Sequence, residues 1–155
     1  MKTFKIMMIA LLAMLTMASC GSDDDDPVIN PATRVANSYV CTGAATFKYV
    51  PTPMASEDTI DIAANNDGSC NIVYRSNVWG KAKFENVALT VNGEKYVVTG
   101  AGKVSMGMHG AAPKDYDAEI TGTIENGKGS FSINVPSVMG GTVIVLTQNA
   151  EESKE

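Results

Sequence analysis

Apolar and polar residues alternate along much of the chain between Ser38 and Asn149. Tyr116–Ile124 shows the pattern most clearly, because its tyrosine, alanine and isoleucines share one face of an extended chain while its acids and threonines share the other. Ser130–Val135 and Val87–Val91 repeat it. Two earlier strands are marked by Ile60, Ile62, Ile72 and Tyr74. One dry and one wet face is typical of antiparallel strands.

Turn signals separate these segments. Asn126-Gly127 and Asn92-Gly93 each lie between apolar strands, and both residue types tolerate a positive φ, so each pair predicts a hairpin. Asn65–Gly68 is a longer turn, and Gly140-Gly141 precedes a last strand over Thr142–Gln148. Residues 38–149 therefore predict an all-β domain of eight or nine strands without an amphipathic helix. Local hairpins favour an up-and-down antiparallel barrel over a Greek-key sandwich.

A small barrel has an interior that side chains either fill or leave open for one small ligand. The alternation predicts these inward residues, as core or as ligand-contacting positions: Tyr39, Phe47, Ile62, Tyr74, Leu89, Tyr96, Ile120, Phe131 and Val145.

Residues 1–19 predict an export signal. Lys2 and Lys5 precede the apolar run Ile6–Leu15, which is shorter than the roughly 20 residues needed to span a bilayer. The next residues, Met17-Ala18-Ser19-Cys20, resemble the lipobox of bacterial lipoproteins. That resemblance implies cleavage after Ser19 and acyl lipid on Cys20, which would be the membrane partner. An ordinary secretory signal with a chance cysteine is the alternative.

An acidic run follows the anchor cysteine, formed by Ser22, Asp23, Asp24, Asp25 and Asp26. Four adjacent carboxylates repel one another and predict an extended tether. The run also resembles the export signal of surface lipoproteins in Bacteroidetes, which implies an outer-membrane protein facing the cell exterior; a periplasmic orientation is the alternative. We expect a tether and linker over residues 20–37, the barrel over 38–149 and a polar tail over 150–155.

Three segments of the barrel resemble the calycin-like β-barrel lipoproteins of Bacteroidetes: Phe84–Val87, Ile120–Ile124 and Gly141–Val145. The resemblance implies an eight-stranded, lipocalin-like barrel and no defined activity. The chain departs from true lipocalins, because no Gly-x-Trp motif opens its first strand and its one tryptophan, Trp79, lies well inside the domain.

Candidate chemistry is sparse. His109 is the only histidine, no G-x-S-x-G nucleophile motif is present, and we expect no enzyme activity and no cofactor. Thioether and imidazole donors suit Cu(I). On a strand, however, Met106 and Met108 would face away from His109, so these residues could not bind one ion together. We therefore expect a methionine-bearing loop at a barrel mouth and no metal. The carboxylates of Asp115, Asp117 and Glu119 fall on a solvent face.

Cys41 and Cys70 remain once Cys20 carries lipid. An exported domain favours a disulfide. In a meander, however, the two cysteines lie on the first and third strands, about 9.6 Å apart, whereas a disulfide needs Cα atoms within roughly 7 Å. A disulfide and two buried free thiols both remain open.

The charge balance excludes some partners. Twelve lysines and arginines against seventeen acids give a net charge of -5, with no basic stripe, so we expect no nucleic-acid partner. Two functions remain. The first is a non-catalytic binding module for a small apolar ligand, and the second is a structural or interaction protein with a filled barrel that binds a surface protein through its loops.

Overall fold

The computed structural model describes residues 29–107 and 110–150. The predicted signal, the Cys20 anchor and the acidic run lie outside these residues. A short helix precedes eight strands, and none of the helices in the described ranges is long and apolar enough to cross a membrane. The elements are α2 (Ala32–Val35), β1 (Asn37–Phe47), β2 (Val50–Ala64), β3 (Cys70–Ser76), β4 (Gly80–Asn92), β5 (Lys95–Met106), β6 (Lys114–Glu125), β7 (Lys128–Val135) and β8 (Thr142–Gln148).

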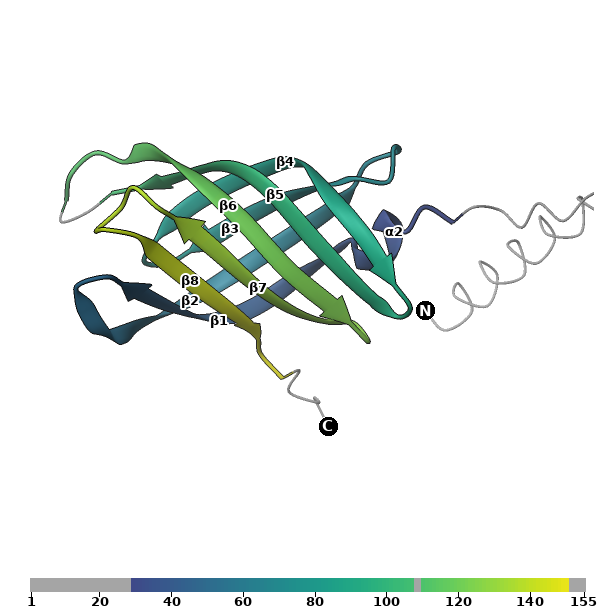
Figure 1. The fold of residues 1–155 in the computed structure, drawn as a ribbon, viewed down its shortest axis with the longest axis horizontal. Helices are drawn as coiled ribbons and strands as arrows, with labels where there is room; N and C mark the ends of the chain where they lie inside the picture. Colours follow the sequence, from purple (N-terminus) through teal and green to yellow (C-terminus); the bar gives the residue numbers. More distant parts are fainter. Residues whose placement is uncertain (1–28, 108–109, 151–155) are drawn as a thin grey trace, which may run out of the picture.

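The strands form a closed antiparallel barrel in chain order (Figure 1). Each strand pairs with the next, and β8 returns to β1 with a register that runs from Cys41–Gln148 to Phe47–Thr142. The up-and-down barrel is confirmed, with eight strands and not nine.

The alternation in β6 is as predicted. Ala118, Ile120 and Ile124 are buried, whereas Asp115, Asp117 and Glu119 are exposed. Lys103 of β5 donates to the Asp117 carboxylate over 2.9 Å on the wet face.

Most of the predicted interior faces inward. Leu89 and Tyr96 are partly buried and pack against the core. Val145 is a wrong prediction: it points outward with 45% exposure, while Ile144 and Leu146 are fully buried. Because β8 is apolar on both faces, a period of two cannot tell which face is inside. The remaining predicted positions are buried, namely Tyr39, Phe47, Ile62, Tyr74, Ile120 and Phe131.

The two Asn-Gly turns differ in detail. Asn126 and Gly127 both have positive φ, 51° and 74°, and form the two-residue loop predicted between β6 and β7. In the other hairpin Asn92 still pairs with Lys95, so the loop is Gly93-Glu94, and only its glycine has a positive φ, 64°. The prediction there is wrong by one residue, since a glycine in the first loop position supplies the left-handed conformation by itself.

A bulge interrupts β4. Phe84 and Val87 are both fully buried although they are three residues apart, which simple alternation does not allow. The register with β3 and β5 shifts between them, and Asn86 takes φ 52°. The Asn71 side-chain oxygen accepts a hydrogen bond from the Asn86 backbone N–H at 3.0 Å. The extra residue in the bulge shifts the alternation by one position, so that Phe84 and Val87 both face the barrel interior.

The predicted linker 20–37 is in part a structural element, contrary to expectation. Ala32 and Val35 of α2 are fully buried. The Tyr39 hydroxyl donates to the Val35 carbonyl at 2.8 Å, and the Asn30 amide donates to the Asn65 carbonyl at 2.6 Å. Four helical residues are too few to show a period in the sequence, so only these contacts reveal the helix.

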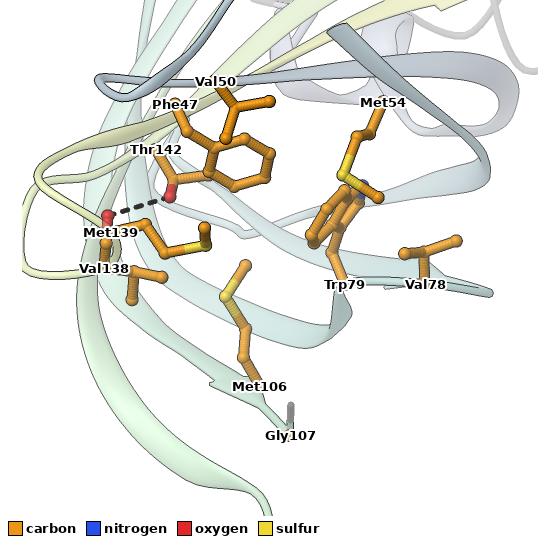
Figure 2. A pocket seen from close by; sticks show the side chains of 10 residues that line it. All are labelled: Phe47, Val50, Met54, Val78, Trp79, Met106, Gly107, Val138, Met139 and Thr142. Atoms are coloured by element: carbon orange, nitrogen blue, oxygen red, sulfur yellow. Dashed lines mark hydrogen bonds between the residues drawn. The ribbon is translucent and has the colours of Figure 1, made fainter. Parts of the chain in front are cut away.

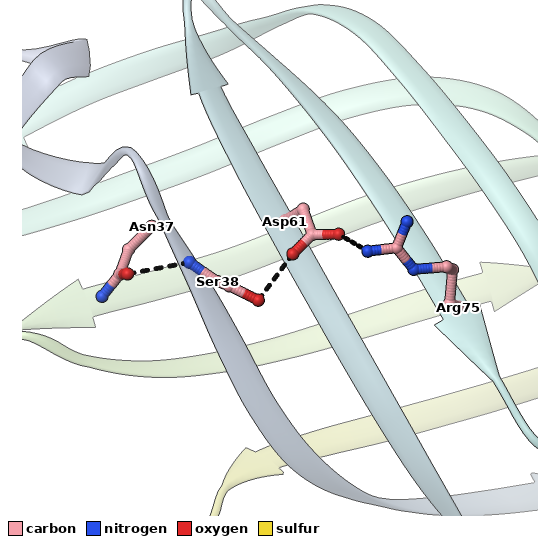
Figure 3. Close-up of polar contacts among 4 residues, drawn as sticks. All are labelled: Asn37, Ser38, Asp61 and Arg75. Atoms are coloured by element: carbon pink, nitrogen blue, oxygen red, sulfur yellow. Dashed lines mark hydrogen bonds and ion pairs between the residues drawn. The ribbon is translucent and has the colours of Figure 1, made fainter.

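Polar side chains connect the outer faces of β1, β2 and β3 (Figure 3). The Asn37 side-chain oxygen accepts from the Ser38 backbone N–H at 2.9 Å, and the Ser38 hydroxyl donates to Asp61 at 2.6 Å. Arg75 pairs with the other Asp61 oxygen. Exposed ion pairs of this kind contribute little to stability, about 0–1 kcal/mol.

Both cysteines of the barrel, Cys41 and Cys70, are buried free thiols, which is one of the two alternatives that the sequence left open. They lie on β1 and β3, as expected for a meander, and the register adds a second separation. Cys41 pairs with Asp58 of β2 while Cys70 pairs with Ala64, six positions along the same strand. Six positions correspond to about 20 Å.

Burial, and secondarily the nearby Asp58 carboxylate, raises the pKa of the Cys41 thiol from 9.0 to about 11. The unfolded chain therefore loses this proton first, and the stability that the neutral thiol contributes is full below pH 9 and declines as the pH rises toward 11. Urea unfolding between pH 8 and 11 should show a shallower alkaline loss of stability in Cys41→Ala than in the parent chain. Equal slopes would contradict the burial argument.

Candidate functional site

The two ends of the barrel differ. At one end lie α2 and the turns that follow β2, β4 and β6. At the other end lie the four connections β1–β2, β3–β4, β5–β6 and β7–β8. Figure 1 shows α2 and the described N-terminal residues on the right and these four connections on the left. We call the second end the mouth.

A pocket of about 380 Å³ lies at the mouth (Figure 2). All four connections, or the strand ends beside them, contribute to it. Eight of its ten lining residues are large and apolar, and the other two are a glycine and a threonine. The lining residues are Phe47, Val50, Met54, Val78, Trp79, Met106, Gly107, Val138, Met139 and Thr142.

One wall of this mouth pocket is aromatic. The rings of Phe47 and Trp79 lie 5.4 Å apart at a tilt of 57°. The Ser76 hydroxyl oxygen accepts the backbone N–H of Val78 at 3.2 Å and of Trp79 at 3.1 Å, which fixes the turn. Gly80 ends it with φ 87°, and a Cβ there would lie 2.0 Å from the Ser105 carbonyl oxygen. Only glycine allows β4 to approach β5 this closely.

Methionines form a second part of the lining. Met106 is 5% exposed at the end of β5, where a methionine-bearing mouth was expected. In Figure 2 its thioether and that of Met139 both turn toward the middle of the pocket. Met139 has φ 49°, a left-handed conformation that is unfavourable for a residue with a long side chain. Its side chain is nevertheless 40% exposed, so burial does not account for that conformation.

Hydrogen-bonding groups are few in this pocket. The buried Thr142 hydroxyl is already satisfied, because it donates to the Val138 carbonyl at 3.0 Å. The Trp79 indole Nε1 is buried and has no hydrogen-bond partner among the described residues. The mouth pocket is therefore suited to an apolar molecule.

Elsewhere the barrel interior is filled by side chains. Tyr39, Tyr74, Phe84 and Phe131 are at most 2% exposed. The rings of Tyr39 and Phe131 meet edge to face at 5.5 Å. These residues make a solid core, so the middle of the barrel has no room for a ligand.

The core also holds one polar cluster that the sequence did not predict. Asp58 is 2% exposed and accepts hydrogen bonds from the Ser56 hydroxyl at 2.7 Å and the Tyr74 hydroxyl at 3.2 Å. Gly43 leaves the space for it, since a Cβ there would lie 1.8 Å from an Asp58 oxygen. Burial raises the pKa of the Tyr74 phenol above its usual range, so this hydroxyl remains a donor.

Other candidate groups are not brought together. His109 and Met108 lie outside the described residues. Within residues 29–107 and 110–150, no three histidine, cysteine, aspartate or glutamate side chains are grouped to hold a metal ion.

Of the predicted interior residues, only Phe47 lines the mouth pocket. The alternation of apolar and polar residues did not indicate the other apolar lining residues outside β5, which are Val50, Met54, Val78, Trp79, Val138 and Met139. One signal was available: apolar residues stand directly before a turn glycine in Val78-Trp79-Gly80 and Val138-Met139-Gly140. Large apolar side chains in a turn can be buried only if the end of the barrel contains an apolar space for them.

The barrel is similar to a protein of Bacteroides fragilis NCTC 9343 whose crystal structure is described as that of a "putative outer membrane protein". The TM-score is 0.65 with 27% identity, and the match covers 77% of this chain and 46% of the other, so this chain spans about half the length of that protein. Rv2717c from M. tuberculosis has a similar fold, with TM-score 0.50 and 13% identity over 82% of this chain and 100% of that one. No protein-family model and no curated protein matches the chain.

Met139 offers a test of whether the mouth holds strain. Asparagine tolerates the left-handed region, where other side chains cost about 1–2 kcal/mol. We expect Met139→Asn to raise the free energy of unfolding by about 1 kcal/mol, measured by urea denaturation, because relief of the backbone strain exceeds the packing lost from a side chain that is 40% exposed. Met139→Leu is the matched control, since it keeps both the strain and an apolar side chain. A less stable asparagine variant would show that Met139 contributes packing that outweighs its strain.

Proposed function

We propose that this protein is a lipid-anchored, surface-exposed and non-catalytic binding module that holds a small apolar molecule in the mouth pocket. The pocket carries the proposal. Its volume of about 380 Å³ falls within the usual range for small-molecule sites, roughly 300–1,000 Å³. The lining of the pocket is almost wholly apolar. The pocket opens to solvent between half-exposed side chains, so a ligand can enter there.

The mouth exposes more apolar surface than folding requires. Met54, Val78 and Met139 are 47%, 43% and 40% exposed, and all three line the same pocket. Single exposed apolar residues are ordinary, whereas a contiguous group of them marks a binding surface. The left-handed backbone of Met139 also supports a binding site at the mouth, because backbone strain is often found at functional sites.

The proposed anchor is the acyl lipid on Cys20. Met17–Cys20 resembles a lipobox, and Ser22–Asp26 resembles a surface export signal. The likeness to the Bacteroides fragilis protein supports an outer-membrane location. On this proposal the chain is a calycin-like lipoprotein, and the mouth lies at the end of the barrel away from the N-terminal tether, so that it is open to the cell exterior.

The anchor can be tested in cells of a Bacteroidetes host. Cys20→Ser should abolish labelling by radioactive palmitate, because no thiol remains to accept diacylglycerol. Replacing Asp23–Asp26 with asparagine should preserve the label while protecting the barrel from protease added to intact cells. Palmitate label on the serine variant would rule out Cys20 as the anchor, and protease sensitivity of the asparagine variant would remove the export role of the acidic run.

The pocket can be tested through Trp79, which is the only tryptophan of the chain and lies in its wall. Contact with 1-bromooctane, a brominated hydrocarbon, should quench its fluorescence with saturation in the chain from Gly21 onward. Met54→Gln places an amide in the wall and should weaken this binding about tenfold, the loss expected for about 1.5 kcal/mol of apolar contact.

The matched control is Val40→Gln, since Val40 is 58% exposed on the outer face of β1 and far along the strand from the mouth. Equal losses in both variants would mean that the bromoalkane binds the surface without specificity. Absence of quenching in the parent chain would reject the ligand pocket and favour the other function, a filled barrel that binds a protein through its loops. Tyr49, 74% exposed in the β1–β2 turn, would then belong to that contact.

A further inference from the structure

The indole N–H of Trp79 is a buried donor without an acceptor. Its nitrogen is inaccessible to solvent and has no hydrogen-bond partner among the described residues. A buried donor left unpaired costs about 1–3 kcal/mol. Native proteins leave few such groups, and each one calls for an explanation.

The fold fixes the position of this donor. Ser76 holds the backbone of Trp79, and Phe47 packs against the indole ring. The ring therefore cannot turn freely toward water. In the view of Figure 2 the indole nitrogen lies behind the side chain of Met54. Met54 is 47% exposed and has three rotatable side-chain bonds, so it can move aside when a ligand enters.

The remaining lining residues cannot satisfy the indole, and none of them competes for a ligand's oxygen. Eight have no strong acceptor in their side chains, and the hydroxyl of Thr142 is engaged with Val138. Among the residues that the structure describes, no lysine, arginine or histidine lines the pocket. A buried carboxylate would therefore lack a cationic partner, which is costly, whereas a neutral oxygen would not.

We infer that the ligand of the mouth pocket is an apolar molecule that carries one neutral hydrogen-bond acceptor, such as a ketone, ester or ether oxygen, and that Trp79 Nε1–H donates to it. The inference rests on the proposed function and adds the chemical class of the ligand. The apolar lining supplies affinity, and the indole N–H, as the one free strong donor among the described lining side chains, sets the orientation of the ligand.

Cyclooctanone and cyclooctane test this inference, since they have nearly the same shape and differ by one carbonyl. In the ¹⁵N-labelled chain from Gly21 onward, the single indole N–H resonance should move downfield with cyclooctanone and much less with cyclooctane. Trp79→Phe keeps an aromatic ring without the donor. It should weaken cyclooctanone binding about fivefold to tenfold, the worth of one hydrogen bond to a buried donor, and change cyclooctane binding less than about twofold.

The possible failures are distinguishable. If both ligands bind but shift the indole resonance equally, or lose affinity equally in Trp79→Phe, the donor role is overturned and the apolar pocket stands. If neither ligand binds the parent chain, the proposed function fails and this inference fails with it. The resonance measurement needs only the parent chain, so it decides the question even if Trp79→Phe does not fold.

Discussion

The pairing of β8 with β1 is the constraint on which the rest of the structure depends. Seven residue pairs, from Cys41–Gln148 to Phe47–Thr142, close the sheet and remove both of its edges. Closure at eight strands also sets the diameter, which leaves an interior just wide enough for side chains. Tyr39, Tyr74 and Phe131 occupy it, and a ligand has no room beside them.

Closure gives the barrel two ends with different environments. At one end α2 covers the interior, held by Tyr39 and by Asn30 through hydrogen bonds to backbone carbonyls. At the other end no element of the described residues covers the interior, and the connections provide their own apolar side chains. A packed middle and one covered end therefore leave the mouth as the place where an apolar ligand can enter the barrel, and residues from four separate connections meet there.

Several positions tolerate unfavourable local features that the barrel as a whole stabilises. Asn86 adopts a left-handed conformation so that Phe84 and Val87 both reach the core. Gly43 gives up a side chain so that Asp58 can be buried with its two hydroxyl donors. Met139, with its left-handed backbone, and Trp79, with its unpaired indole N–H, carry costs of a similar kind. Both line the mouth pocket, which is where such features are expected if it binds a ligand.

The sequence by itself determined the fold class and most of its local detail. Alternation in Tyr116–Ile124 gave both faces of β6, and Asn126-Gly127 gave a turn in its place, because a strand period and a hairpin turn are short-range properties of the backbone. Where the local signal was ambiguous the predictions were wrong, as for Val145 in a strand that is apolar on both faces. The linker helix was also missed, because its stability comes from distant contacts.

Only the tertiary structure decided which residues meet. The register of β1, β2 and β3 separated Cys41 from Cys70, and barrel closure brought Phe47, Trp79, Met106 and Met139 to one pocket. Residues 47 and 139 are far apart in the chain, so no local pattern links them. The sequence determined how each strand and turn forms, since those depend on neighbours within a few residues. The pocket depends on closure of the whole sheet and could be seen only in the folded chain.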